Sequence, residues 1–322
     1  MSLKDIKFQD RAIEFLTASM EKDRLSGSLL FFGPDSVGKS TAALMVAKAL
    51  NCCMGSPSYS CDSCTSCRKI DGKNHPDVHW IVPEGAGNKI KIERIRALKE
   101  NMALKPFEGK AKFFIIEDAD QLSDSAANSL LKILEEPPKD SYIILISDDL
   151  YKILPTIRSR CQWVLFSQAR PDDLKSFLAK ERKMPEKEAL LLARLSEGRI
   201  GKAIKMKEAG SIEWKNEVID RFTEDNIIFH EDPLFFDNKR EEMLGIMDVL
   251  VSWYRDIFIL SNGRDRSLVV NADRIEELES RSRSLSADNV NNILREVLQA
   301  RSDIAGNVNP KLVFSSLVCH LE

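Results

Sequence analysis

The sequence has little net charge and no long apolar run, and each shortage limits how the protein can bind nucleic acid or a membrane. The formal net charge of the 322-residue chain is −3, so no whole-molecule field attracts DNA or an anionic membrane, and any nucleic-acid contact must be local or made by a partner. No apolar run approaches the ~18 residues of a membrane span. The first residues, MSLKDIKFQDRAIEF, lack the apolar segment of a signal peptide. We therefore expect a cytoplasmic protein that uses no membrane.

Histidine is also scarce. His75, His79, His230 and His320 show no spacing typical of metal ligands or of a catalytic triad, and we assign them no chemistry. The hydrophobic content of 43% and the charged content of 30% are those of an ordinary globular protein. The length allows two or three domains with a substantial core.

The first half of the chain alternates short apolar segments with amphipathic ones. Five segments are predicted to be strands: Ser28–Phe32, Val78–Val82, Lys112–Ile116, Tyr142–Ile146 and Gln162–Phe166. Helical spacing lies between them, for example from Ile92 to Met102 and from Ala127 to Leu134, the second after an N-cap candidate at Ser123. Strands that alternate with helices in this way predict an α/β fold with a parallel sheet covered on both faces.

The second half contains no convincing strand. The stretch from Pro171 to about Lys207 is predicted to be a small helical unit, with breaks at Met184–Pro185 and Gly198–Gly201. From about Ile212 longer helices dominate.

The stretch LLFFGPDSVGKSTAAL carries a phosphate-loop motif between a predicted strand and a predicted helix. In the pattern G-x-x-x-x-G-K-[ST], backbone N–H groups cradle phosphates, the lysine neutralises the β/γ oxygens and the hydroxyl reaches Mg²⁺. The candidate nucleotide-binding residues are therefore Gly33, Gly38, Lys39, Ser40 and Thr41. The alternative is a degenerate loop that is retained only as a turn.

The stretch KFFIIEDADQLS ends a predicted strand with Glu117 and then Asp118. An ATP-hydrolysing phosphate-loop protein is expected to have the aspartate first, for Mg²⁺, and the glutamate second, to orient the attacking water. The inverted order shortens the second side chain by about one C–C bond, and a misplacement of ~1 Å can cost ~10²-fold in rate. The two residues are either a weakened catalytic pair or solvated acids at a strand end.

Five of the seven cysteines crowd into NCCMGSPSYSCDSCTSC. Cys61, Cys64 and Cys67 follow the C-x-x-C spacing, and Cys52 or Cys53 supplies a fourth thiol. Because disulfides are rare in a reducing compartment and four thiolates complete a tetrahedral site, we predict a structural Zn²⁺ site, with Cys52 as the first ligand. A redox role and plain buried cysteines are the alternatives.

A further motif, LPTIRSRCQWVLF, places Arg158 and Arg160 on either side of Ser159. Taken alone, these are two solvated arginines. Together with the phosphate loop, the cysteine cluster and NSLLKILEEPP, they resemble the bacterial DNA polymerase III clamp-loader family of AAA+ proteins. The resemblance implies that Arg160 acts in trans, as a finger in the ATP site of a neighbouring subunit, where it stabilises charge on the transferred phosphoryl group.

Within that family, the residues are more similar to the delta-prime branch than to the gamma/tau motors. The segment with Gly72, His75, Pro76 and Asp77 is typical of delta-prime. The motors carry the standard Asp-Glu pair and a lid arginine, and here Gly201 stands at the arginine position, with Arg199 and Lys202 only nearby. Ser147 falls where the family's first sensor lies, so the resemblance makes it a nucleotide-binding candidate.

The resemblance implies three domains: an AAA+ phosphate-loop domain over 1–166 with a zinc module at 52–67, a helical lid over 167–210 and a helical collar for oligomerisation over 211–322. It implies a stator that helps to load the sliding clamp onto primed DNA together with gamma/tau and delta subunits. ATP and Mg²⁺ are candidate ligands, but we expect negligible turnover because the acids are inverted and the lid arginine is missing.

Three alternatives remain at this point. The chain is a gamma/tau-type motor if it turns over ATP by itself. It is a zinc-binding interaction scaffold with a vestigial phosphate loop if it has no nucleotide affinity. Direct DNA binding by the cysteine module is the third, and salt-dependent binding to primed DNA would reveal it.

Overall fold

The computed structural model of the chain describes residues 3–54, 56, 59–84, 89–223, 240–306 and 308–321. The chain forms two compact units, Met1–Ala169 with Arg199–Lys202, and Arg170–Gly198 with Ala203–Glu322. The expected lid and collar fall mainly in the second unit, and their separation into two domains stays a prediction. The expected collar range includes 224–239, and these residues, with His230 among them, lie outside the described ones.

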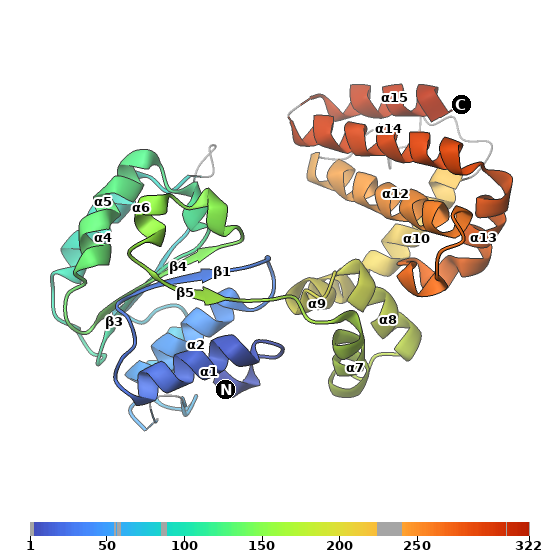
Figure 1. Ribbon diagram of the computed structural model, residues 1–322. Helices are drawn as coiled ribbons and strands as arrows, with labels where there is room; N and C mark the ends of the chain where they lie inside the picture. Colours follow the sequence, from blue (N-terminus) through green and yellow to red (C-terminus); the bar gives the residue numbers. More distant parts are fainter. Residues whose placement is uncertain are drawn as a thin grey trace. The chain divides into compact units, whose positions relative to one another are not determined.

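The first unit alternates helices and strands as predicted (Figure 1). Its α-helices are α1 (Asp10–Glu21), α2 (Lys39–Asn51), α3 (Thr65–Asp71), α4 (Ile92–Met102), α5 (Asp124–Glu135) and α6 (Pro155–Arg158). Its strands are β1 (Ser28–Phe32), β2 (Val78–Ile81), β3 (Lys112–Ile116), β4 (Ser141–Ser147) and β5 (Gln162–Leu165). The strand positions differ from the predicted ones by at most one residue at an end, because ladder hydrogen bonds, not hydropathy, define strand ends.

The five strands form a parallel sheet in the order β2-β3-β4-β1-β5. Strand β1 therefore lies inside the sheet, paired with β4 on one side and β5 on the other. In open parallel sheets, ligands bind outside the carboxyl ends of the strands, where the strand order reverses. That edge holds the residues after β1, β3 and β4, and the phosphate-loop motif is one of these segments.

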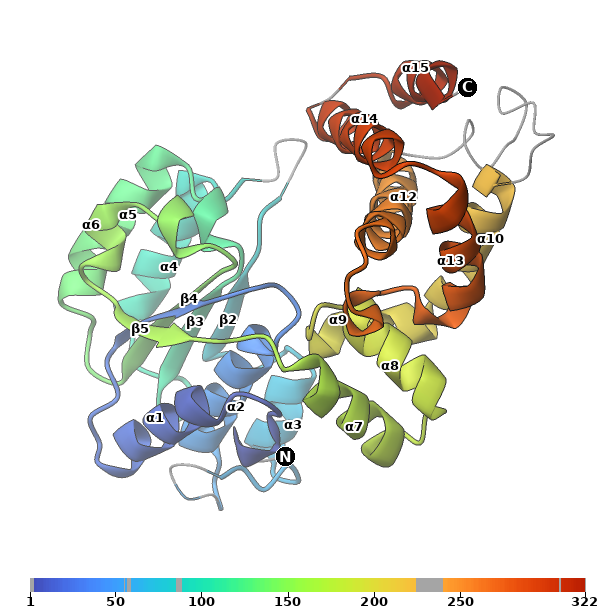
Figure 2. The ribbon, with the colours of Figure 1, turned by 45° about the vertical axis from the view of Figure 1, so that its right-hand side comes forward.

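Helices cover both faces of the sheet (Figures 1 and 2). On one face, Leu29 and Phe31 of β1 pack into a core shared with α1 and α2. On the other, Leu30 packs into a core shared with α4, α5 and α6. Burial on both faces explains why the strands read as continuous apolar runs. Each such side chain contributes roughly 1.5–3 kcal/mol by leaving water.

A helix cap and a helical apolar face are found at the residues where the sequence predicted them. The Ser123 side chain accepts a hydrogen bond from the N–H of Ala126 and caps α5, which ends before Pro137. Ile95, Leu98 and Met102 are the buried residues of α4, as the helical spacing predicted.

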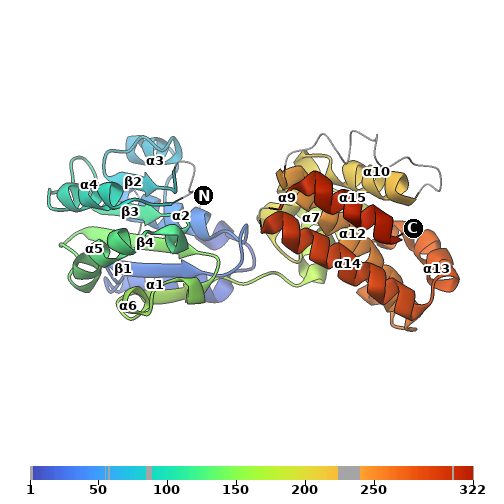
Figure 3. The same ribbon diagram turned by 90° about the horizontal axis from the view of Figure 1, so that it is seen from above.

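The second unit consists of helices, and side chains between Val218 and Leu317 form its large core. The helices after β5 are α7 (Pro171–Glu181), α8 (Glu186–Leu195), α9 (Ile200–Glu208, whose first residues belong to the first unit), α10 (Ser211–Thr223), α12 (Arg240–Ser261), α13 (Ile275–Ser284), α14 (Ala287–Ala305) and α15 (Pro310–Leu321). Trp253 of α12 is fully buried at the centre. Helix α14 lies between α12 and α15 (Figures 1 and 2), and Figure 3 gives the view of these helices from above. Among the described residues, no helix has the length and apolar character for crossing a membrane.

Candidate functional site

The phosphate-loop motif connects β1 to α2, in the strand-loop-helix context that the sequence predicted. Gly33 has a φ of 134°, and a Cβ there would lie 1.9 Å from the carbonyl oxygen of Phe166, so only glycine fits where the loop leaves the sheet. Gly38 has a φ of 108° and precedes α2. Ser40 and Thr41 lie in the first turn of that helix.

The Lys39 side chain is bound by its own chain. Its Nζ lies 2.5 Å from the carbonyl oxygen of Gly33, 2.6 Å from that of Pro34 and 2.8 Å from Oδ1 of Asp148, and the residue is only 5% exposed. An ammonium has three donors, and these three acceptors satisfy them. A phosphate group that Lys39 binds must therefore displace at least one of these contacts.

Acidic residues gather at the carboxyl edge of the sheet. Glu117 follows β3, and Asp118 has a left-handed backbone with a φ of 47°. Burial raises the pKa of Asp118, and the carboxylates of Asp148, Asp120 and Glu117 raise it further, while Lys39 acts in the opposite direction. The edge therefore carries carboxylates that a divalent cation such as Mg²⁺ could neutralise.

Ser147 ends β4 and pairs in register with Phe32, directly before the phosphate loop. It is buried, and its hydroxyl donates to the backbone oxygen of Asp149 at 3.0 Å and lies 3.3 Å from Oδ1 of Asp120. The structure thus brings Ser147 and the phosphate loop to one edge of the sheet. The sensor role of Ser147 stays a prediction.

Residues 199–202 join the first unit at the phosphate loop. The guanidinium of Arg199 forms an ion pair with Asp35, and the N–H of Gly201 donates to the carbonyl oxygen of Ser36 at 2.8 Å. The sequence indicated only that Arg199 is close to the lid-arginine position. It carried no signal for the partner, because Asp35 and Arg199 are separated by 164 positions.

The cysteine cluster converges as predicted. The Sγ atoms of Cys52, Cys61, Cys64 and Cys67 all lie within 4.8 Å of one another. Cys53 is exposed and stands outside this set. Backbone N–H groups point at the sulfurs: that of Cys61 lies 3.3 Å from Sγ of Cys52, and those of Cys64 and Cys67 lie 3.4 and 3.5 Å from the preceding cysteine's Sγ. In the structure, therefore, Cys52 and not Cys53 completes the cluster of four sulfurs.

The four cysteines fit a tetrahedral metal such as zinc. Zn–S bonds of about 2.3 Å place the four sulfurs about 3.8 Å apart, within the 4.8 Å that bounds the observed cluster. Hydrogen bonds from Ser63 and Cys64 lower the pKa of the Cys61 thiol to about 6, which favours the thiolate that binds metal. Burial raises the pKa of Cys67, whose thiolate would need a nearby cation. Together these side chains could supply the ligands of a closed site, with no position left for a substrate.

Charged residues that the sequence did not single out support this cluster. Lys48 of α2 is 2% exposed, and its Nζ lies 2.6 Å from Asp62 and 2.8 Å from Asp71, one carboxylate inside the cysteine segment and one at the end of α3. Lys110 donates to the carbonyl oxygen of Cys52 at 2.8 Å. These contacts attach the segment to the α/β unit without the metal.

Asp77, from the motif after the cysteines, orders a neighbouring loop. Its carboxylate is fully buried and accepts the N–H groups of Phe107, Glu108 and Gly109 at 2.7–2.9 Å. Burial alone would raise the pKa of Asp77, but these hydrogen bonds, with His75, hold it below its ordinary value. The role of this aspartate in the described structure is therefore to hold a loop.

Arg160 lies just before the amino end of β5. Its Nε donates to Oε1 of Glu135 at 2.5 Å and its Nη1 to the backbone oxygen of Thr156 at 2.9 Å, and its side chain is 31% exposed. Because β5 is parallel to β1, Arg160 and the phosphate loop are at opposite ends of their strands, roughly 20 Å apart along the sheet. The structure does not bring this arginine together with its own phosphate loop.

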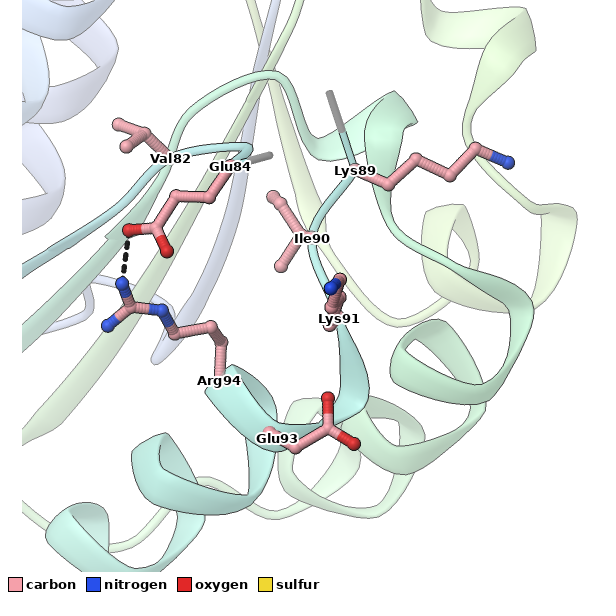
Figure 4. Close-up of a pocket in the computed structure, with 7 residues that line it drawn as sticks. All are labelled: Val82, Glu84, Lys89, Ile90, Lys91, Glu93 and Arg94. Carbon is pink, nitrogen blue, oxygen red and sulfur yellow. Dashed lines mark hydrogen bonds and ion pairs between the residues drawn. The ribbon is translucent and has the colours of Figure 1, made fainter. Parts of the chain in front are cut away.

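A separate hollow of about 540 Å³ lies at the carboxyl end of β2 (Figure 4). It is lined by Val82, Glu84, Lys89, Ile90, Lys91, Glu93 and Arg94. Glu84 and Arg94 form an ion pair across it. Strands β3 and β4 separate β2 from β1, so this hollow is not part of the phosphate-loop site.

Comparison with known proteins identifies the family. A model described as DNA polymerase III, delta subunit, matches residues 8–170, and one for the C-terminal part of that subunit matches residues 219–322. DNA polymerase III subunit delta′ of Bacillus subtilis is 32% identical over 98% of this chain and 97% of its own length. The chain belongs to the DNA polymerase III delta-prime family.

Curated relatives of the gamma/tau type match a smaller part of this delta-prime family member. The tau subunit of Escherichia coli is 33% identical over 63% of this chain and 32% of its own length. Among solved structures, a protein of Thermotoga maritima related to the DNA polymerase III gamma subunit is 20% identical, with a TM-score of 0.48 over 96% of this chain and 98% of that one. The full-length match favours delta-prime over the gamma/tau type.

Proposed function

We propose that this chain is a stator of the clamp loader: it assembles with gamma/tau and delta subunits, helps to load the sliding clamp onto primed DNA, and lends Arg160 to the ATP site of a gamma/tau neighbour. The full-length similarity to a delta-prime subunit supports the assembly. The position of Arg160, partly exposed and at the end of the sheet away from its own phosphate loop, supports action in trans. This position is the single observation that carries the proposal.

In this mechanism the guanidinium stabilises negative charge on the phosphoryl group that the neighbour transfers. Glu135 and the carbonyl of Thr156 hold Arg160 against its own chain. Their contacts orient the side chain before the neighbour binds. The lid and the collar would place this surface in the ring.

The chain's own ATP turnover is negligible under this proposal. Lys39 is engaged by two carbonyls and Asp148, and the acid that follows β3 is a glutamate, with the shorter Asp118 second. ATP with Mg²⁺ is a ligand that Gly38, Lys39 and Ser40 could hold, without the geometry that hydrolysis needs. Zn²⁺ on the four cysteines is structural, and the complex acts in the cytoplasm.

The decisive experiment is ATP hydrolysis by the complex reconstituted with gamma/tau, delta, sliding clamp and primed DNA. We expect Arg160→Ala to abolish the contribution of the one ATP site that receives this arginine, where a finger in trans is worth roughly 10³–10⁵-fold. Arg158→Ala is the matched control, because that guanidinium lies two positions away, over the ring of Tyr151, and should leave turnover unchanged.

ATP hydrolysis by the isolated chain distinguishes the proposed stator from the alternative, a gamma/tau-type motor. Magnesium-dependent turnover that Lys39→Ala abolishes would show that the inverted acids still work and that the chain is a motor. Equal turnover of the complex with wild-type chain and Arg160→Ala would reject the finger.

A further inference from the structure

Two contacts fasten the phosphate loop to residues 199–202. Arg199 pairs with Asp35 through its guanidinium, and its side chain is only 16% exposed. The Gly201 N–H donates to the carbonyl oxygen of Ser36 at 2.8 Å. Asp35 and Ser36 are both inside the motif that cradles phosphates. The loop is thus held by groups of the protein on the side of residues 199–202, in addition to the contacts of Lys39.

Gly201 permits this approach. A Cβ at this position would lie 2.8 Å from the carbonyl oxygen of Ser36 and 3.3 Å from its Cβ, which is closer than side chains tolerate. A larger residue would push the segment off the loop and break the hydrogen bond. The absence of a side chain at 201 therefore has a structural use in this chain.

Asp35 places a carboxylate inside the phosphate-loop motif. Burial would raise the pKa of Asp35, but the hydrogen bond and the charge of Arg199 outweigh it and lower the pKa, so the carboxylate is ionised at neutral pH. A carboxylate on a phosphate loop repels phosphate, and an arginine beside it attracts phosphate. Because the two side chains bind each other, each one cancels the effect of the other.

We propose that the Asp35–Arg199 ion pair sets the affinity of the phosphate loop for a nucleoside triphosphate, with Asp35 withholding from the phosphates a guanidinium that would otherwise bind them. This inference rests on the proposed nucleotide-binding capacity of the loop and not on the role of Arg160. It makes Arg199 a latent phosphate-binding residue and Asp35 the residue that keeps affinity low.

Removing the charge of Asp35 and removing the charge of Arg199 should change the affinity for Mg-ATP in opposite directions. Asp35→Asn removes a negative charge from the loop and releases Arg199, so binding of Mg-ATP should tighten by roughly three- to tenfold. Arg199→Ala leaves Asp35 with only the weaker effects of Ser36 and Lys202 beside it, so binding should weaken by a similar factor. The double variant Asp35→Asn/Arg199→Ala should lie between the two single variants, because neither the repulsion nor the attraction remains.

The experiment measures dissociation constants of Mg-ATP for the full chain by calorimetry at one ionic strength, with thermal unfolding of each variant as a check on folding. Asp172→Asn, on the exposed first turn of α7, is the matched control for the change in net charge and should bind like the wild type. In the Asp35→Asn background, Lys39→Ala should remove the added affinity, which locates it at the phosphate loop.

Three outcomes would overturn the proposal. They are a shift in the same direction for both single variants, no shift beyond that of Asp172→Asn, and no measurable binding by any variant including Asp35→Asn. If one of these occurs while Arg160→Ala still silences a site of the reconstituted complex, the stator function stands and only the ion-pair inference fails.

Discussion

A candidate site lies at each end of helix α2: the phosphate loop at the amino end and the cysteine cluster at the carboxyl end. The two sites differ in whether their ligand-binding side chains are already bound by other groups of the protein. At the amino end, Lys39 completes a motif, yet its ammonium is bound by two loop carbonyls and by Asp148. At the carboxyl end, Cys52 joins three other sulfurs that converge on one point. A motif therefore tells which groups are near a site, and the tertiary contacts decide whether those groups are available for a ligand.

This contrast agrees with the proposed stator. A ligand at the cysteine end would complete the structure, because four soft donors surround it. A nucleotide that Lys39 binds must first displace a protein contact of that side chain, and under the ion-pair proposal it competes with Asp35 for Arg199. We accordingly expect large effects from changes at the cysteine end and small ones at the loop.

The largest effect is expected for Cys67→Ser. Removing one thiolate opens the tetrahedral set, and structural zinc sites of this kind contribute roughly 10 kcal/mol of binding free energy to the folded state. The purified variant should contain less than the one Zn²⁺ per chain expected for the wild type, and its first unit should unfold at a lower temperature. Cys53→Ser is the control, because this exposed residue is outside the set. An equal loss of zinc in both variants would contradict the assignment of Cys52.

The next effect is expected for Lys48→Met. This change leaves Asp62 and Asp71 without their shared cation and should destabilise the chain by about 3 kcal/mol, at the low end for a broken buried pair because both carboxylates keep contact with water. Urea unfolding of the zinc-loaded protein measures it. Lys69→Met breaks a contact of the same length with Glu108, but Lys69 is 38% exposed, so the loss should be about 0.5 kcal/mol. Similar losses in the two variants would show that burial of Lys48 has no special importance.

A smaller, pH-dependent effect is expected for Asp77→Asn. The pKa of Asp77 is lower in the folded chain than in the unfolded one, so ionised Asp77 stabilises the fold at neutral pH, and that stabilisation is lost as the pH falls through the folded pKa. The difference in unfolding free energy between wild type and variant should be about 2 kcal/mol at pH 7 and should shrink below about pH 4. A difference that grows on acidification would have the wrong sign for this account.

The smallest effect is expected for Lys39→Ala in the reconstituted complex. Since this chain lends an arginine and does not hydrolyse ATP, total turnover should change by less than about twofold, measured beside Arg160→Ala under the same conditions. A loss as large as that of Arg160→Ala would mean that nucleotide at this loop is required, and the contrast between the two ends of α2 would disappear.

Much of the fold follows from local patterns. The strands β1 and β3 have the predicted bounds, because residues buried on both faces of a parallel sheet must be apolar throughout. The cysteine spacing likewise predicted the site that the structure confirms as a cluster. The roles of Arg160, Glu117, Asp118 and Ser147 are still predictions, since each depends on a ligand or a neighbour.

The parts that could not be predicted depend on residues far apart in the chain. Nothing in the sequence pairs Lys39 with Asp148, Arg160 with Glu135, or Asp35 with Arg199, because ion pairs between distant segments leave no periodic signal. The sequence also left the choice between Cys52 and Cys53 open. The two residues are adjacent, so their distances along the chain from Cys61 differ by only one position. Only the direction of each side chain in the folded protein distinguishes them.

The sequence by itself determined the parallel α/β class, the helical second half, the phosphate-loop motif and the chemistry of a four-cysteine site. Hydrophobic periodicity and the spacing of special residues act over short distances and are visible in the chain. The tertiary structure alone decided which thiol completes the cluster, that Lys39 and Arg199 are engaged by carboxylates of the same chain, and that Arg160 lies away from its own phosphate loop. Those are questions of distance and direction, and they are answered only when the sheet order brings remote segments to one edge or to opposite edges.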